Sequence, residues 1–267
     1  MLRISAPAKI NLYLHITGKR SDGYHLLDSL VAFTEYGDVL EITSSERLEL
    51  TVTGPFAASL SEDNLVMRAA RLLQEYTGCK KGAQITLHKN IPIGAGLGGG
   101  SSDAAAALLG LQKLWGVTLA SDKLQELALK LGSDVPVCLL RKTSRVGGIG
   151  DEVTPVAMEW DKHWLVLVNP NVPLLTADVY RRFSGPFSLP SAPPHNDLEA
   201  PAIVLLPVVA DVLSAIHRSG CELARMSGSG ATCFGLYESE EAAQIAAQNL
   251  QQQHPDWWIQ STGWYKD

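Results

Sequence analysis

Hydrophobic and polar positions alternate in the first part of the chain with the period of two that is typical of β-strands. Residues 2–17 alternate and then become apolar, and Pro7 interrupts them, so the pattern predicts a pair of strands. The apolar side chains beyond this proline share one strand face: Ile10, Leu12 and Leu14. Lys9 and Asn11 lie on the opposite face, which is either solvated or turned toward a ligand.

The pattern of the following residues predicts strands and helices in turn. Predicted strands lie at 38–53 and 83–88, and predicted helices lie at 65–77, 102–115 and 121–131. Two of these helices end at a glycine, Gly78 and Gly132, as helices commonly do. A short apolar run at 135–139, broken by Pro136, looks like a strand.

The pattern restarts near residue 163 and predicts a second set of elements. Predicted strands lie at 164–168 and 257–264, two apolar segments fill 221–237, and predicted helices begin at Thr176 and cover 202–218 and 239–252. Residues 184–201 hold five prolines among serine and small residues, which indicates a loop or lid. This order predicts a two-layer α+β domain.

A domain boundary is expected just after the glycine-rich turn at 147–152. We therefore predict an N-terminal domain at 1–155 and a C-terminal domain at 156–267, a division that suits a length of 267 residues.

Composition narrows the classes of protein. The net charge of −6 argues against broad nucleic-acid binding, which needs a basic face. The longest apolar runs are short, and the N-terminus becomes polar at once, so we expect neither a membrane span nor a signal peptide. The four cysteines show no metal-ligand spacing, which favours free thiols and a cytoplasmic location. Monomer and homodimer both remain open.

The stretch with the strongest chemical signal runs from Pro92 to Asp103 and leads into an alanine-rich helix. Five glycines stand within residues 94–100, and each costs backbone entropy when it is ordered. Such a loop suits a backbone that approaches a ligand closely. The start of the following helix offers unpaired N–H groups and positive potential, so a phosphate group is the expected ligand.

Three phosphate-binding loops compete for this stretch. A P-loop is excluded because Gly100 stands where its lysine must be. The dinucleotide pattern G-x-G-x-x-G is present at Gly94, Gly96 and Gly99, but no buried strand precedes it directly and no acidic strand end follows. The pattern Pro-x-x-x-Gly-Leu-Gly followed by serines, found in small-molecule kinases, matches residue by residue.

Three further segments carry polar side chains in turns. Tyr24 and His25 follow an Asp-Gly turn and could pack in a hairpin or bind a heteroaromatic base. Asp134 follows Gly132 and could cap a helix or act on a substrate. Residues 225–232 form a second glycine-serine turn.

Taken together, these segments resemble the galactokinase, homoserine kinase, mevalonate kinase and phosphomevalonate kinase (GHMP) superfamily. The resemblance covers essentially the whole chain. It implies an α+β, two-domain GHMP-kinase fold, with an N-terminal domain like domain 2 of ribosomal protein S5 that contains a left-handed βαβ unit. The C-terminal domain would be ferredoxin-like, with the active site in the cleft between them.

The resemblance also implies residue roles and ligands. Lys9 and Asp134 match the catalytic pair. The positions that match the site of a cytidine-diphosphate-linked methylerythritol substrate are Asn11, Tyr24, His25, Thr176 and Tyr180. The positions that match the ATP site are Asn64, Lys89, Pro92, Gly94, Gly96, Leu97, Gly98, Gly99, Gly100, Ser101 and Ser102. ATP would bind with Mg²⁺, for which Ser102 is the one metal contact offered.

Two departures from the family pattern stand out. Residues 140–145 are more basic than expected, and no separate acidic metal ligand can be placed. The alternatives are another small-molecule kinase of the superfamily, a non-catalytic relative that binds a ligand, and a dehydrogenase.

Overall fold

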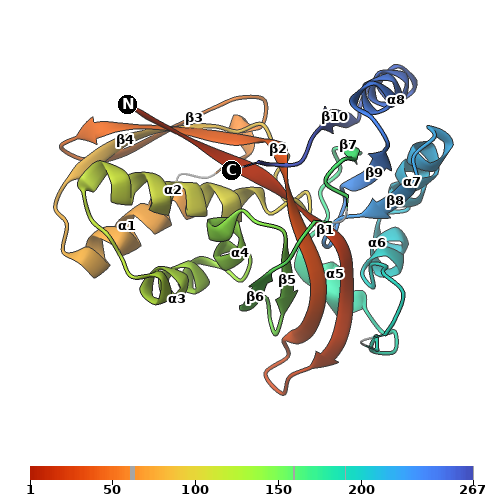
Figure 1. Cartoon of the computed structure of the whole chain (residues 1–267), viewed down its shortest axis with the longest axis horizontal. Coiled ribbons are helices and arrows are strands. Elements are labelled where there is room, and N and C mark those ends of the chain that lie inside the picture. The colour runs from red at the N-terminus through yellow and green to blue at the C-terminus, as the bar shows by residue number, and fades with distance from the viewer. Residues whose placement is uncertain (61–63, 159, 190, 267) are drawn as a thin grey trace. The chain divides into compact units, whose positions relative to one another are not determined.

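The computed structural model of the chain (Figure 1) describes residues 1–60, 64–158, 160–189 and 191–266. Its residues form two compact units that interleave along the sequence. The first unit comprises Met1–Ala8, Gly37–Ile93 and Gly98–Arg141. The second comprises Lys9–Tyr36, Gly94–Leu97 and Lys142–Asp267. A consecutive division between residues 155 and 156 stays a prediction.

Two long strands supply residues to both units: β1 (Leu2–Lys19) and β2 (His25–Ser45). In the first unit, β2 pairs antiparallel with β4 (Gly82–His88), which pairs parallel with β3 (Leu48–Thr53). A parallel pair needs a crossover connection, and helix α1 (Leu65–Thr77) lies in the one between β3 and β4.

Helix α1 begins and ends where local chemistry dictates. The Asn64 side chain accepts hydrogen bonds from the backbone N–H groups of Val66 (3.0 Å) and Met67 (3.3 Å), as an N-cap residue does. Gly78 adopts the left-handed conformation (φ 66°) that ends many helices. The predicted helix at 65–77 is therefore confirmed.

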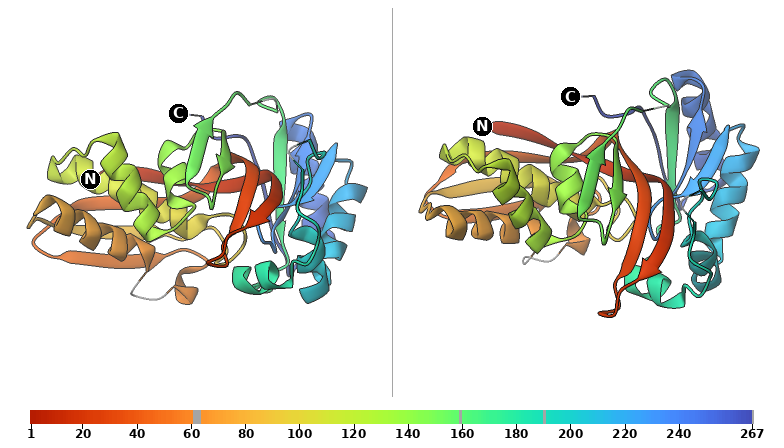
Figure 2. Two further views of the ribbon diagram at one scale, coloured as in Figure 1. Left: turned by 90° about the horizontal axis from the view of Figure 1, so that it is seen from below. Right: turned by 60° about the horizontal axis from the view of Figure 1, so that its bottom comes forward.

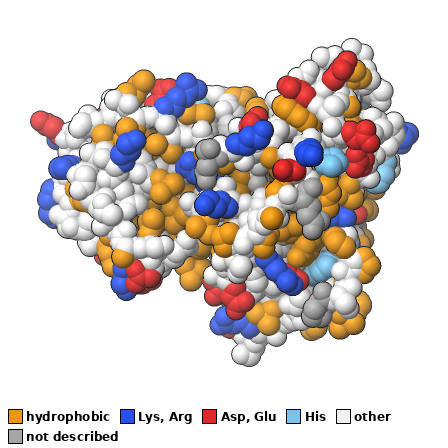
Figure 3. Space-filling view, in the orientation of Figure 1, with side chains coloured by type: hydrophobic (Ala, Val, Ile, Leu, Met, Phe, Trp, Pro, Cys, Tyr) orange, Lys and Arg blue, Asp and Glu red, His pale blue; other side chains and the backbone are white. Residues whose placement is uncertain are grey.

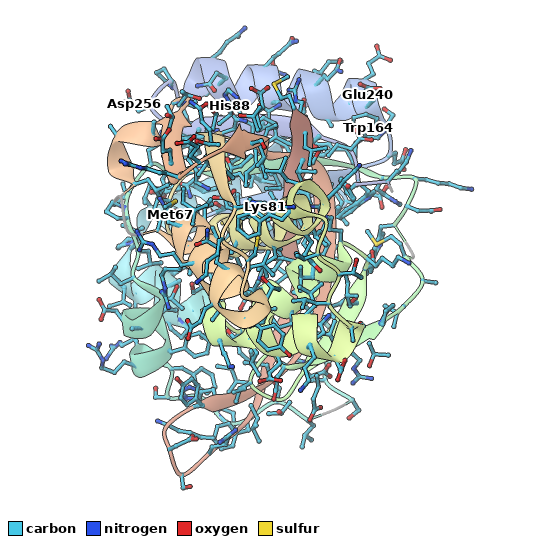
Figure 4. The ribbon with its side chains drawn as sticks, turned by 90° about the vertical axis from the view of Figure 1, so that its left-hand side faces the viewer. Met67, Lys81, His88, Trp164, Glu240 and Asp256 are labelled. Atoms are coloured by element: carbon cyan, nitrogen blue, oxygen red, sulfur yellow. The ribbon has the colours of Figure 1, made fainter. Side chains whose placement is uncertain are left out.

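Four further helical segments complete the first unit: the 3₁₀ segment η1 (Ala57–Ser59), α2 (Gly99–Trp115), α3 (Ser121–Leu131) and α4 (Val135–Leu140). Helix α2 is central, because its alanines at 104–107 are all fully buried. Its far end is fixed by the Trp115 indole, which donates to Gly82 O (3.0 Å). Lys81, labelled in Figure 4, donates to Trp115 O (2.7 Å).

The second unit contains a hairpin and a four-stranded antiparallel sheet. Strands β5 (Ser144–Gly147) and β6 (Glu152–Pro155) form the hairpin, which extends from β2. The sheet has the order β10-β7-β9-β8. Its strands are β7 (Trp164–Asn169), β8 (Leu223–Met226), β9 (Cys233–Tyr237) and β10 (Trp258–Thr262).

Helices α7 (Val208–Arg218) and α8 (Glu240–Gln253) pack on this sheet, on one face of it in both views of Figure 2. Their apolar residues, including Val212, Ile216 and Leu250, join Val166 and Val168 in one buried cluster. Strand and helix order together give the predicted ferredoxin-like arrangement. The α+β class is confirmed.

Three proline positions correct the predicted elements. Pro7 does not split the first strand, because β1 pairs only with β2 among the described strands and an edge position tolerates the missing N–H group. Residues 135–139 form helix α4 and no strand, because Pro136 stands in the first helical turn, where its missing donor costs nothing.

Pro207 divides the predicted helix at 202–218. The structure has α6 (Glu199–Leu205) and α7 instead, since a proline disfavours helical geometry at the residue before it, and Leu206 is extended (φ −140°, ψ 86°). The expected helix at Thr176 is confirmed as α5 (Thr176–Arg182).

The structure shows how charges are distributed on one face and where the cysteines lie. On the face drawn in Figure 3, basic and acidic side chains are interspersed. None of the helices in the described part of the chain is long and apolar enough to cross a membrane. All four cysteines are free thiols, of which Cys138 and Cys233 are buried.

Candidate active site

The glycine-rich loop ends in the N-terminus of helix α2, in the first unit. Gly98 takes the left-handed conformation (φ 59°) at the N-cap, and the helix begins at Gly99. The predicted start at residue 102 was therefore three residues late. The N-terminal N–H groups and the helix dipole attract an anion at this point.

Ser102 lies in the first turn of this helix and is fully buried. Its hydroxyl oxygen has no hydrogen-bond partner among the described residues, which is unusual for a buried polar atom. An unpartnered oxygen beside glycine N–H groups suits a phosphate or a phosphate-bound cation.

A buried charge cluster supports the same helix turn. The Lys89 ammonium group donates to Asp103 Oδ2 (2.7 Å) and to Asp38 Oδ2, and all three residues expose 2% or less. Asp38 Oδ1 also accepts the backbone N–H groups of Asn90 and Ile91 (2.5 and 2.9 Å). The Lys89 side chain is thus buried in this charge cluster, and its assignment to the ATP site stays a prediction.

Burial and neighbouring charges shift the pKa values of this cluster in opposite directions. Burial raises the pKa of Asp103 to about 7, against the opposing effect of the Lys89 charge. Burial by itself would lower the pKa of Lys89, but the carboxylates of Asp103 and Asp38 outweigh it and raise that pKa. The ammonium form of Lys89 is therefore the stable one at neutral pH.

Asp134 occupies the N-cap position of α4, at φ −84° and ψ −15°, and is half-buried. Its side chain makes no capping hydrogen bond, so helix capping does not account for this carboxylate. The interpretation as a reactive group stays open and stays a prediction.

In the second unit, Lys9 and Asn11 on β1 expose only 5% and 4% of their surface, so they do not form a solvated face. The Lys9 backbone N–H donates to Leu97 O (2.8 Å). The Asn11 amide donates to Ser29 Oγ (2.8 Å), while its Oδ1 has no donor among the described residues. That buried oxygen can accept a hydrogen bond from a ligand.

The second glycine-serine turn holds residues 94–97 of the glycine-rich loop. Ser227 Oγ donates to Gly96 O (3.0 Å) and accepts the Asn11 N–H (3.1 Å). The Thr232 N–H donates to Ala95 O (3.1 Å). Ser227 is a functional candidate that the site prediction missed, although the turn itself was recognised from its Ser-Gly repeat.

Aromatic side chains gather around His25. Its ring packs against Tyr180 (centroids 5.3 Å apart) and edge-on against Phe183 (6.0 Å). Burial, with a smaller effect of Lys19, lowers the pKa of His25, so the neutral imidazole can both donate and accept. Tyr24 is 61% exposed. Phe183 was missed; it is the C-cap residue of α5, and its extended backbone lies outside the predicted helical pattern.

Thr176 and the remaining predicted positions also have defined surroundings. The Thr176 hydroxyl shares a hydrogen bond with Ser229 Oγ (2.8 Å), which links α5 to the glycine-serine turn. Asn64 uses its amide oxygen to cap α1. No group of three or more His, Cys, Asp or Glu residues that could hold a metal ion occurs among the residues described.

Two sequence profiles of one kinase family match the chain. The profile of the GHMP kinases N terminal domain matches residues 64–142, and that of the GHMP kinases C terminal domain matches residues 189–256. Proteins named 4-diphosphocytidyl-2-C-methyl-D-erythritol kinase are similar over nearly the full length. One from Paramagnetospirillum magneticum is 52% identical and one from Parvibaculum lavamentivorans is 48% identical, with 96% of each chain covered in both cases.

Solved structures give the same picture. A crystal structure of 4-(cytidine 5'-diphospho)-2C-methyl-D-erythritol kinase is 36% identical, with a TM-score of 0.83 over 98% of this chain and 99% of the other. A homoserine kinase from Cytophaga hutchinsonii is 20% identical, with a TM-score of 0.75 over 98% and 94% of the two chains, and this likeness concerns the fold alone.

Proposed function

The chain belongs to the GHMP kinase family, in its branch of 4-diphosphocytidyl-2-C-methyl-D-erythritol kinases, and from this premise we propose how its own residues carry out the reaction. The γ-phosphoryl group of ATP passes to the 2-hydroxyl group of 4-diphosphocytidyl-2-C-methyl-D-erythritol, a step of the non-mevalonate isoprenoid pathway. The observation that carries the proposal is the buried, unpartnered Ser102 hydroxyl at the N-terminus of α2.

The triphosphate is bound mainly by backbone groups. Phosphoryl transfer passes through a loose transition state, so the protein contributes positioning and charge stabilisation. The N–H groups at Gly98, Gly99 and Gly100 and the dipole of α2 would hold the β-phosphate. Pro92, Leu97 and Ser101 would shape the same loop, and Asn64 and the Lys89 segment would border the nucleotide.

The residues present fit one Mg²⁺ contact. A hard cation prefers oxygen ligands, and the Ser102 hydroxyl is a buried oxygen that no described residue uses. Bound Mg²⁺ supplies charge neutralisation on the phosphate oxygens. Ser102 would hold the cation from the protein side.

Asp134 and Lys9 have complementary roles in the proposed reaction. Asp134 would orient the substrate hydroxyl group and accept its proton. A loose transition state requires proton removal only late, so a weak base such as a carboxylate suffices. Lys9 would offset the negative charge that develops on the transferred group.

The substrate's two ends have separate contacts in this proposal. Tyr24 and Tyr180 would stack on the two sides of the cytosine ring, and His25, which packs against Tyr180, would lie at its edge. The neutral His25 imidazole would bond to the polar edge of the base. Asn11 Oδ1 and the Thr176 hydroxyl would bind the erythritol unit.

The test is a coupled assay of ATP-dependent phosphorylation, with the cytidyl-methylerythritol substrate compared against homoserine, mevalonate and galactose. We expect turnover only with the cytidyl substrate. Equal turnover of another alcohol would contradict the substrate assignment.

The catalytic assignment is tested by Asp134→Asn. Loss of one acid–base group should lower kcat by about 10²-fold or more. ATP binding, measured by calorimetry, should be unchanged because the carboxylate has no role in holding the nucleotide. Glu126→Gln on the exposed face of α3 is the matched control and should leave kcat unchanged. Near-normal turnover of Asp134→Asn would remove the assigned role.

A further inference from the structure

A short segment ahead of α6 holds the glycine-serine turn in place. Asn196 is 6% exposed, and its amide nitrogen donates to Met226 O and Gly228 O, at 2.8 Å each. Its Oδ1 accepts the Leu198 N–H (2.9 Å). Three hydrogen bonds therefore fix this one side chain, and two of them end on the turn.

Glu199, the first residue of α6, makes a second contact with the glycine-serine turn. Its Oε2 accepts the Met226 N–H (3.1 Å). The backbone of Met226 is thus bound at its carbonyl group by Asn196 and at its N–H group by Glu199. Both contacts come from residues that lie outside the glycine-serine turn and outside the predicted site.

Within the second unit, the turn contacts three residues that the proposed function assigns to binding: Gly96, Asn11 and Thr176. Ser227 bonds to Gly96 O and to the Asn11 N–H. Ser229 bonds to Thr176. Any displacement of the turn would move its contacts with the phosphate-binding loop and with the substrate-binding residues together.

The turn packs directly against the phosphate-binding loop. A Cβ atom on Gly96 would overlap Ser227 O and lie 2.8 Å from Gly230 O. A Cβ atom on Gly228 would lie 3.0 Å from Gly96 O and 3.3 Å from Asn11 Oδ1. Backbone therefore lies directly against backbone, and the position of the turn sets the position of Gly96.

We propose that Asn196 and Glu199 are positioning residues for the phosphoryl transfer: they hold the glycine-serine turn of residues 225–232, and this turn holds Gly96 and Asn11. This inference rests on the proposed function. Neither residue touches substrate in this account. Their effect reaches the reaction through the turn, and so it appears in the rate of transfer more than in the binding of either substrate.

The experiment uses one isosteric variant and one rescue pair. Asn196→Asp keeps the acceptor for Leu198 but replaces the two donated hydrogen bonds with repulsion. Glu199→Ala removes the acceptor for Met226, while Glu199→Gln retains a carbonyl oxygen there. Because a displacement of about 1 Å can cost about 10²-fold in rate, we expect kcat to fall about 10- to 100-fold in Asn196→Asp and Glu199→Ala.

The pattern of constants separates positioning from loss of structure. KM for ATP and for the cytidyl substrate should change much less than kcat, and Glu199→Gln should restore kcat. Hydrogen exchange in residues 226–232 should become faster in the two slow variants. Gln251→Ala is the matched control, because this amide also donates to backbone carbonyl groups but at the end of α8. It should leave kcat unchanged.

Each outcome decides one proposal. An unmodified chain without cytidyl kinase activity overturns the proposed function and this inference with it. An active chain whose Asn196→Asp and Glu199→Ala variants keep kcat, or whose Glu199→Gln variant fails as Glu199→Ala does, overturns the inference alone. If Asn196→Asp does not fold, the two Glu199 variants decide.

Discussion

Lys89 forms two buried ion pairs, with Asp38 and with Asp103. Its ammonium group contacts two carboxyl groups that are equally buried, and these contacts offset the desolvation of the ammonium group. Removal of one partner from such a group is costly, since the charges left behind have no solvent to stabilise them.

Lys89→Met should therefore lower the free energy of unfolding by about 3–5 kcal/mol, measured by urea denaturation. Lys123→Met is the control: its ion pair with Glu126 is about half exposed, and solvent screening leaves such pairs with little effect on stability. Equal stability of the two variants would contradict the buried-cluster account.

A second residue-scale prediction concerns acid stability. The hydrogen bonds from Arg145 hold the pKa of Asp28 below its ordinary value. A carboxyl group with a depressed folded pKa stabilises the protein above its unfolded pKa of about 4, and that contribution disappears as the pH falls through the folded value. Asp28→Asn should thus be less stable than the unmodified chain at pH 6.

The stability difference between Asp28→Asn and the unmodified chain should shrink progressively below about pH 4, when thermal melting is followed at several pH values. A difference that stays constant down to pH 2 would show that the charge of Asp28 has no part in it. Arg145 belongs to the basic stretch at 140–145 that departs from the family pattern, and this pairing is the structural use of one of its charges.

The glycine-rich loop shows at the scale of elements why two glycines with similar backbones are not equivalent. Gly94 and Gly96 both have positive φ, 66° and 75°. A Cβ atom on Gly94 would meet nothing within 4 Å, whereas one on Gly96 would overlap the backbone of the glycine-serine turn.

Gly94→Ala should cost about 1–2 kcal/mol of unfolding free energy, the penalty of a left-handed alanine. Gly96→Ala should cost more and should abolish turnover, because the turn must move. Both variants are compared by thermal melting and by the coupled assay. Equal losses would mean that conformation alone, without the contact, explains the need for glycine.

Helices and strands with local signals were predictable from the sequence. Gly78 and Gly132 end helices as expected, and the β4 strand follows its alternation. The proline positions were not, because the cost of a missing N–H group depends on whether a partner strand or a preceding turn needs it. Pro7 lies in an edge strand and Pro136 in a first helical turn, where no partner needs the missing N–H group. Pro207 lies inside the stretch predicted as one helix, where the preceding turn would need it.

The candidate site also contains residues that the sequence could suggest and residues that it could not. The glycine-rich loop and Ser102 could be proposed from the sequence, because a phosphate site requires particular residue types at consecutive positions. Asn196 and Glu199 could not, since their partners lie about thirty residues away and the contact is to backbone atoms, which leave no trace in the partner's sequence. Lys89 was assigned to ATP from its position, and only the structure shows its ammonium group facing inward.

At the scale of the molecule, the interleaved units predict what a cut chain can do. In the second unit, Leu14 N donates to His195 O and Leu14 O accepts the Asp197 N–H, at 2.9 Å each. In a fragment of residues 1–155 these partners are missing, whereas every residue of the first unit is present.

Hydrogen exchange on that fragment should therefore show protected amides in β4 and fast exchange in residues 9–17 of β1. The full chain, as the control, should protect both. Protected amides at 9–17 in the fragment would mean that the β1–β2 pairing suffices, and that the later residues add nothing to the strand's stability.

The same connectivity has a consequence for biosynthesis. Residues 9–36 leave the ribosome long before residues 195–227, with which they form hydrogen bonds, and at 5–20 residues per second the interval is about 10–40 s. A nascent chain carries an unfinished strand edge during that time, and such edges attract other chains. The yield of folded protein should thus depend on chaperones that shield the β1–β2 strand pair during synthesis.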